Sequence, residues 1–124
     1  MLNLPPSVKL YACTTPADMR KSFNGLSALA RSHLKKDPLS GHLFIFFNRR
    51  QNQCRCLYWD RDGYAIFAKR LARGTFNVPW TPGKELLPTH EMNASELLLV
   101  LGGVDLEKTK RRKRWTPVAD PFQK

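Results

Sequence analysis

The block between residues 43 and 78 constrains the fold of this chain most strongly, because it alternates short apolar runs with polar turns. Residues 43–47 form a continuous β-compatible apolar run, short enough for a strand that is buried on both faces. Residues 54–59 and 64–71 predict two further strands, and residues 75–78 are a candidate for a short fourth. Because the connections are short and polar, the block predicts an antiparallel β-meander.

A tight turn is predicted between the second and third of these strands. Its sequence is Asp60-Arg61-Asp62-Gly63, in which Gly63 is expected to take a positive φ. The Asp-x-Asp-Gly pattern resembles the start of a calcium-binding loop. Such a loop requires a glutamate at its twelfth position, which here is Leu71. The segment therefore predicts a hairpin turn.

A first helix is predicted after a short strand at residues 8–13. Thr15 is its expected N-cap, Pro16 its first residue, and Asp18 lies three residues after the cap. The apolar positions that follow have the three- and four-residue spacing of one helix face. They are Met19, Phe23, Leu26, Ala30 and Leu34. Asp37-Pro38 ends the predicted helix, since a residue before proline avoids helical geometry.

A second helix is predicted near the end of the apolar part of the chain. Asn93 and Glu96 have the spacing of a capping box, and Gly102-Gly103 ends the helix. A last short strand is expected at residues 104–106. The resulting fold class is α+β: a small antiparallel β-meander with both helices packed on one face. Residues 1–106 are expected to form this single domain, and residues 107–124 a basic, flexible tail.

The net charge of +11 indicates which partners the chain prefers. It arises from 21 Lys and Arg against 10 Asp and Glu. Residues 1–106 contain 14 basic and 8 acidic side chains, and residues 107–124 contain 7 and 2. Because both parts are cationic, a polyanion such as DNA is the expected partner. The alternative is an ordinary basic surface whose charge maintains solubility.

Two groups of cations are candidate DNA-binding residues. The start of strand two and the end of strand three share one end of a meander, so cations there are expected to gather and bind phosphates. These residues are Arg49, Arg50, Lys69, Arg70 and Arg73. The second group is in the tail: Lys110, Arg111, Arg112, Lys113 and Arg114. Arg20 and Lys21 are weaker candidates, at the start of the first predicted helix.

No cofactor, metal site or catalytic residue is predicted. Cys54 and Cys56 would face one side of a strand, but no second ligand pair at zinc-site spacing accompanies them. The three cysteines without a leader sequence predict a reducing, cytoplasmic location. No apolar run has the length of a membrane span. A nuclease remains a minor alternative, for which loss of magnesium-dependent cleavage on Asp60→Ala or Asp62→Ala would be the test.

Four ordered segments resemble a known family. Residues 18–26 (DMRKSFNGL) and residues 37–44 (DPLSGHLF) are similar to its helix opening and its first turn and strand. Residues 57–76, through LYWD, KRL and GTF, and residues 98–105 resemble its later motifs. The family is the small TnpB-type proteins encoded by the second open reading frame of IS-sixty-six-family bacterial insertion sequences. The chain departs from the pattern at Ala72 and at Gly103-Val104.

This resemblance implies a non-enzymatic accessory protein for DNA transposition. A separate, larger protein of the element carries the transposase centre. The expected partners are DNA at the element ends, bound with low sequence specificity, the transposase and a second accessory protein. A protein–protein adaptor that does not bind DNA is the alternative.

Overall fold

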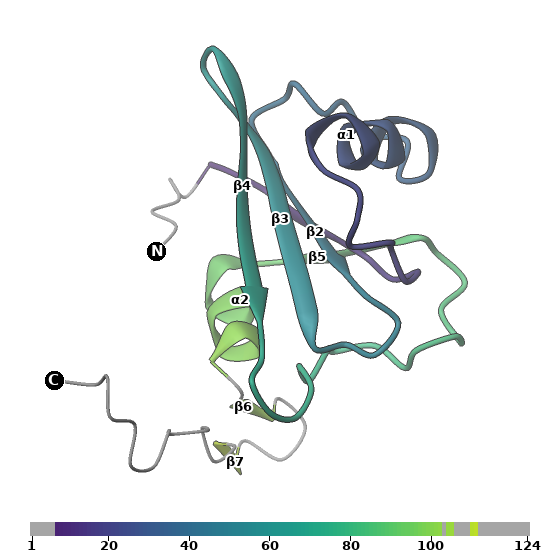
Figure 1. Ribbon diagram of the computed structural model, residues 1–124, viewed down its shortest axis with the longest axis vertical. Coiled ribbons are helices and arrows are strands. Elements are labelled where there is room, and N and C mark those ends of the chain that lie inside the picture. Colours follow the sequence, from purple (N-terminus) through teal and green to yellow (C-terminus); the bar gives the residue numbers. More distant parts are fainter. Residues whose placement is uncertain (1–6, 103, 106–109, 112–124) are drawn as a thin grey trace, which may run out of the picture.

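A five-stranded sheet forms the centre of the molecule (Figure 1). The computed structural model describes residues 7–102, 104–105 and 110–111. The elements of the main body are β1 (Leu10–Cys13), α1 (Phe23–Ser32), β2 (Leu43–Phe47), β3 (Gln53–Asp60), β4 (Gly63–Arg70), β5 (Thr89–Met92) and α2 (Ala94–Leu101). Two short strands follow, β6 (Val104–Asp105) and β7 (Lys110–Arg111), which pair with each other.

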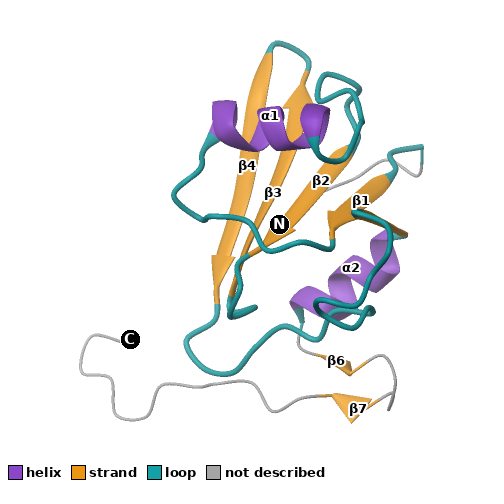
Figure 2. Ribbon diagram, turned by 90° about the vertical axis from the view of Figure 1, so that its right-hand side faces the viewer, coloured by secondary structure: helices purple, strands orange, loops and turns teal. Residues whose placement is uncertain are grey.

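The strand order is β4-β3-β2-β1-β5, which corrects the predicted meander. Strands β2, β3 and β4 are antiparallel as predicted, but β1 pairs with β2 in parallel and with β5 in antiparallel. Figure 2 shows β4 to β1 side by side. All four residues of β1 are buried. A strand buried in this way is typical of the interior of a sheet, and β1 lies between β2 and β5.

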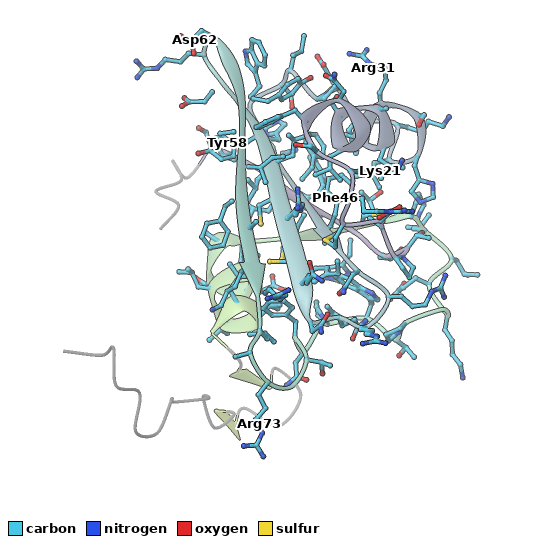
Figure 3. All side chains as sticks on the ribbon, in the orientation of Figure 1. Lys21, Arg31, Phe46, Tyr58, Asp62 and Arg73 are labelled. Atoms are coloured by element: carbon cyan, nitrogen blue, oxygen red, sulfur yellow. The ribbon has the colours of Figure 1, made fainter. Side chains whose placement is uncertain are left out.

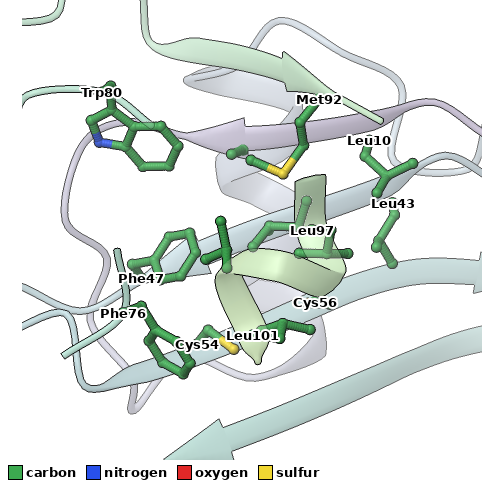
Figure 4. Packing of buried hydrophobic residues seen from close by; sticks show 13 residues of the cluster. Leu10, Leu43, Phe47, Cys54, Cys56, Phe76, Trp80, Met92, Leu97 and Leu101 are labelled. Atoms are coloured by element: carbon green, nitrogen blue, oxygen red, sulfur yellow. The ribbon is translucent and has the colours of Figure 1, made fainter. Parts of the chain in front are cut away.

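The two helices lie on opposite faces of the sheet, so the expectation that both cover one face is wrong. On β2, Leu43, Ile45 and Phe47 belong to the cluster that contains Leu97 and Leu101 of α2 (Figure 4). The alternate residues Phe44 and Phe46 pack with Leu26 and Ala30 of α1. The period of two along a strand sends these sets to opposite sides. The continuous apolar run at residues 43–47 is therefore explained by a helix on each face.

Helix α1 begins at Phe23, later than predicted, because the preceding segment bonds elsewhere. The backbone N–H of Ala17 donates to the Phe47 carbonyl at the end of β2 (2.8 Å). The Thr15 hydroxyl pairs with the ring of His33 rather than capping a helix (3.0 Å). Ser22 holds the N-cap position without a side-chain cap bond. Tertiary contacts thus override the local helix-start pattern.

The segments around β5 also differ from prediction. Residues 75–78 form no strand, and Phe76 is buried instead against Phe47, with ring centroids 5.7 Å apart. Strand β5 forms where the sequence predicts none, in register with β1. In the β3–β4 turn, Arg61 takes the positive φ (57°) that was expected of Gly63.

Helix α2 matches its prediction and permits a test of its cap. The Asn93 side chain accepts a hydrogen bond from the Glu96 backbone N–H (2.8 Å), and the Glu96 carboxylate accepts one from the Asn93 N–H (3.3 Å). We expect Asn93→Ala to lower the free energy of unfolding by about 1 kcal/mol. Urea denaturation measures this. The matched control is Ser22→Ala, which removes an N-cap side chain that makes no cap bond. An equal loss in both variants would contradict the assigned role of Asn93.

Candidate functional site

Three chain segments meet at one end of the sheet. Ala17 is bonded to the end of β2, which brings residues 17–21 there. The β2–β3 turn, residues 48–52, is at the same end by the register of the hairpin. Residues 71–76 close against that turn, since the Leu71 N–H donates to the Asn52 carbonyl (2.8 Å) and the Phe76 N–H to the Gln51 carbonyl (2.7 Å).

Seven cationic side chains belong to these segments and to the adjoining ends of β3 and β4. We call this set the basic end: Arg20, Lys21, Arg49, Arg50, Arg55, Arg70 and Arg73. Figure 3 shows Arg73 at the opposite end of the molecule from Asp62, which is at the tip of the β3–β4 hairpin, and Lys21 between these two ends, beside the sheet. All members are exposed except Arg55, which is partly exposed.

Asp18 is the only acidic residue in these segments, and Arg20 neutralises it. The Arg20 guanidinium donates to both Asp18 oxygens at 2.7–3.1 Å. These hydrogen bonds lower the pKa of Asp18 to about 2, so the carboxylate remains ionised near neutral pH. This is the only ion pair within the part of the chain that the structure describes. Among the described residues, the other six positive charges of the basic end have no carboxylate partner at ion-pair distance.

The β2–β3 turn, which carries Arg49 and Arg50, is closed by hydrogen bonds of the Asn48 side chain. The Asn48 side-chain oxygen accepts from the backbone N–H groups of Asn52 and Gln53, both at 3.0 Å. Its amide nitrogen donates to the Asn52 side chain (2.7 Å). A pocket of about 400 Å³ lies between this turn and the segment that precedes α1. Its lining is Ala17, Asp18, Met19, Asn48, Arg49, Arg50, Asn52 and Gln53.

Four of the five cations that the sequence singles out in the folded body are at the basic end: Arg49, Arg50, Arg70 and Arg73. Lys69 is not with them. It points to the α2 side of the sheet, where its Nζ donates to the Leu101 carbonyl (2.9 Å). A cation there satisfies a carbonyl at the helix C-terminus and opposes the negative end of the helix dipole. Lys69 thus has a structural bond that competes with phosphate binding.

The sequence did not single out Arg55, and it gave Lys21 only as a weaker candidate, although both belong to the basic end. The Arg55 guanidinium donates to the Lys21 carbonyl (3.2 Å), which joins β3 to the segment before α1. The alternation of side chains along β3 could have identified Arg55. Cys54 and Cys56 face α2, so Arg55 must face the other side, together with Arg70.

In the tail, Lys110 and Arg111 form β7, paired with β6. The other tail candidates, Arg112, Lys113 and Arg114, lie outside the described residues.

The described residues do not form a metal centre. No three His, Cys, Asp or Glu side chains within the described ranges are grouped to hold a metal ion. Asp60 and Asp62 lie at the hairpin tip without a third acid. Cys54 and Cys56 share the α2 face as predicted, and both are buried free thiols. The hydrogen bond with Cys54, together with burial, raises the pKa of Cys56, so its thiol is protonated and packs as an apolar group.

No helix in the described ranges combines the length and apolarity that crossing a bilayer requires.

Comparison with known proteins gives a family match over most of the chain. A family model described as IS66 Orf2 like protein matches residues 8–111. Two uncharacterized proteins of Sinorhizobium fredii (strain NBRC 101917 / NGR234) are similar along their lengths. The protein y4jC is 35% identical over 121 residues, which covers 96% of this chain and 100% of y4jC. The protein y4hO is 30% identical over 118 residues, which covers 95% and 99%. No solved structure matches.

Proposed function

The chain belongs to the IS66 Orf2 like family of bacterial insertion-sequence proteins, and on that premise we propose that it binds DNA of its element through the basic end. The family indicates an accessory role in transposition and is not a known family of enzymes. The observation that carries the proposal is that three segments and the adjoining ends of β3 and β4 together supply seven cations and one acid, and that this acid is already paired.

The basic end suits the DNA backbone better than the base edges. Arginine binds phosphate through two parallel N–H donors. Apart from Lys21 and the paired Arg20, all cations of the basic end are arginines: Arg49, Arg50, Arg55, Arg70 and Arg73. The basic end is built from turns and strand ends, whereas an α-helix or a two-stranded ribbon is what usually enters the major groove, where sequence is read. We therefore expect contacts to phosphates, with little preference for sequence. The tail cations, Lys110 to Arg114, would add further phosphate contacts.

The test measures binding of the full chain to two duplexes of equal length by fluorescence anisotropy. One duplex has the element-end sequence and the other a shuffled sequence of the same composition. If Arg49, Arg50, Arg70 and Arg73 each contact a phosphate, log affinity should fall against log salt with a slope of about −3.6 or steeper. The two duplexes should bind with similar affinity. No binding to either duplex below physiological salt would contradict the proposal.

A second candidate function, an adaptor between proteins, is favoured by a separate observation. Leu86 is 97% exposed and Leu87 69%, and Leu98 and Leu99 on α2 are 50% and 39% exposed. Exposed apolar residues mark surfaces that bind other proteins where they form a contiguous patch, and each of these two pairs is adjacent in sequence. The proposed partners are the transposase and the second accessory protein of the element. Co-purification with the transposase, combined with absence of DNA binding, would support the adaptor alone.

Binding of DNA inside the bacterial cell would place the protein in the cytoplasm, at the nucleoid.

A further inference from the structure

The two edges of the sheet differ in how well they are protected from pairing. Strand β5, at one edge, has only four residues, follows Pro88 and exposes Glu91. Strand β4, at the other edge, has eight residues. Its first six residues, 63–68, contain neither a charge nor a proline. Short length, charge and proline are the features that normally prevent edge strands from pairing. Strand β4 has none of them over most of its length.

The backbone groups at the open edge of β4 can be identified from its register. The Leu71 N–H donates to the Asn52 carbonyl, in continuation of the β3–β4 ladder. Antiparallel pairs exchange hydrogen bonds at every second residue, so residues 63, 65, 67 and 69 bond to β3. The N–H and C=O groups of Tyr64, Ile66, Ala68 and Arg70 therefore point outward. No partner strand for them exists among the residues that the structure describes.

Apolar side chains accompany these open backbone groups. Tyr64 and Ile66 are only partly buried on the α1 face, and Phe67 is partly buried on the α2 face. A strand placed beside β4 would cover side chains on both faces of the sheet. The pairing would therefore gain hydrogen bonds and apolar burial together.

Charge along the hairpin favours one partner and one direction. Asp60 and Asp62 flank Arg61 at the tip, which leaves the tip net negative, whereas Arg70 and Arg73 lie at the other end of β4 (Figure 3). A second β4 laid antiparallel brings the acidic tip of each copy to the basic end of the other. A parallel arrangement would bring like charges together, which is unfavourable.

We infer that a second copy of this chain pairs with the open edge of β4 in the antiparallel direction. A register centred on Ile66 satisfies all the outward backbone groups of residues 64–68 and brings Asp62 next to Arg70 of the other copy. The result is a two-fold dimer with one continuous sheet, in which each copy contributes its five strands. Its two basic ends lie at opposite ends of the shared strand pair. The inference does not depend on DNA binding.

Proline at position 68 tests this interface with little change to the fold. The Ala68 N–H points outward, so Ala68→Pro removes no bond to β3 and blocks the edge. We expect sedimentation equilibrium of the full chain to give the mass of two copies for the wild type and of one copy for A68P. The matched control is Glu91→Pro, which blocks the outward N–H of the opposite edge strand and should remain dimeric. A monomeric wild type, or a dimeric A68P, would overturn the inference.

A charge exchange provides an independent test in case A68P fails to fold. Asp62→Arg and Arg70→Asp should each raise the dimer dissociation constant at least about tenfold, because each places like charges together. The double variant D62R/R70D restores opposite charges and should recover most of the affinity. If the double variant is as weak as the two single changes combined, the two residues do not face each other, and the proposed register is wrong.

Discussion

Replacing Phe44 by alanine should lower the free energy of unfolding by about 3–5 kcal/mol. Phe44 lies on β2 with no exposed surface, and its ring stacks on Tyr11 with centroids 5.9 Å apart. It packs in the cluster that joins α1 to the sheet, so its loss leaves a cavity between two layers. A domain of this size has a total stability of about 5–15 kcal/mol, so the variant should be close to its unfolding threshold. Urea denaturation followed by circular dichroism measures the change.

Phe23 is the matched control for this prediction. It is a phenylalanine at the start of α1, on the same side of the sheet, but it is 45% exposed. Phe23→Ala should therefore cost about 1 kcal/mol or less, since much of its ring never leaves water. If the two variants lose equal stability, Phe44 is not at the centre of the core between α1 and the sheet. The packing of α1 on this face of the sheet would then be wrong.

The sequence predicted the antiparallel part of the sheet well because its signals are local. Strand β2 matches its predicted bounds, and β3 and β4 differ from theirs by one residue at each end. Apolar runs between polar turns determine such strands without reference to the rest of the chain. The capping box of α2 is equally local, because Asn93 and Glu96 bond only to each other and to the backbone between them.

Apart from the position of the positive φ in the β3–β4 turn, the errors concern contacts between distant parts of the chain. The parallel pairing of β1 with β2, and the place of β5 beside β1, depend on segments more than thirty residues apart. The polar sequence Thr-His-Glu-Met becomes a strand only because β1 offers it an edge. The run at residues 43–47 indicated burial on both faces. Burial on both faces implied a helix on each side of the sheet. The prediction that both helices cover one face did not take this into account.

The same distinction applies to the candidate site. The two ends of a hairpin follow from local strand and turn signals, and these suffice to place Arg49, Arg50, Arg70 and Arg73 together. The position of Lys69 does not follow from such signals. Its bond to the Leu101 carbonyl joins β4 to α2, across 32 residues of sequence. The addition of Arg55 and Lys21 likewise depends on the fold of the segment that precedes α1.

Removing four arginines from the basic end should weaken DNA binding more than removing four exposed cations from elsewhere in the folded body. In the variant R49Q/R50Q/R70Q/R73Q, four phosphate contacts are lost, and each accounts for a slope of about −0.9 in log affinity against log salt. The salt dependence should therefore become shallower by about 3.6. At about 0.1 M salt the affinity should fall on the order of a thousandfold. Fluorescence anisotropy over a salt series measures both quantities in one experiment.

Two controls separate this local effect from a loss of net charge or of fold. The variant K9Q/R31Q/R61Q/K84Q removes four exposed cations from outside the basic end and should change the slope little. Lys69→Gln breaks the bond to the Leu101 carbonyl and should lower the free energy of unfolding by about 1 kcal/mol without changing the slope. If both quadruple variants weaken binding equally, DNA responds only to total charge. The location of Arg49, Arg50, Arg70 and Arg73 at the basic end would then have no effect on the affinity for DNA.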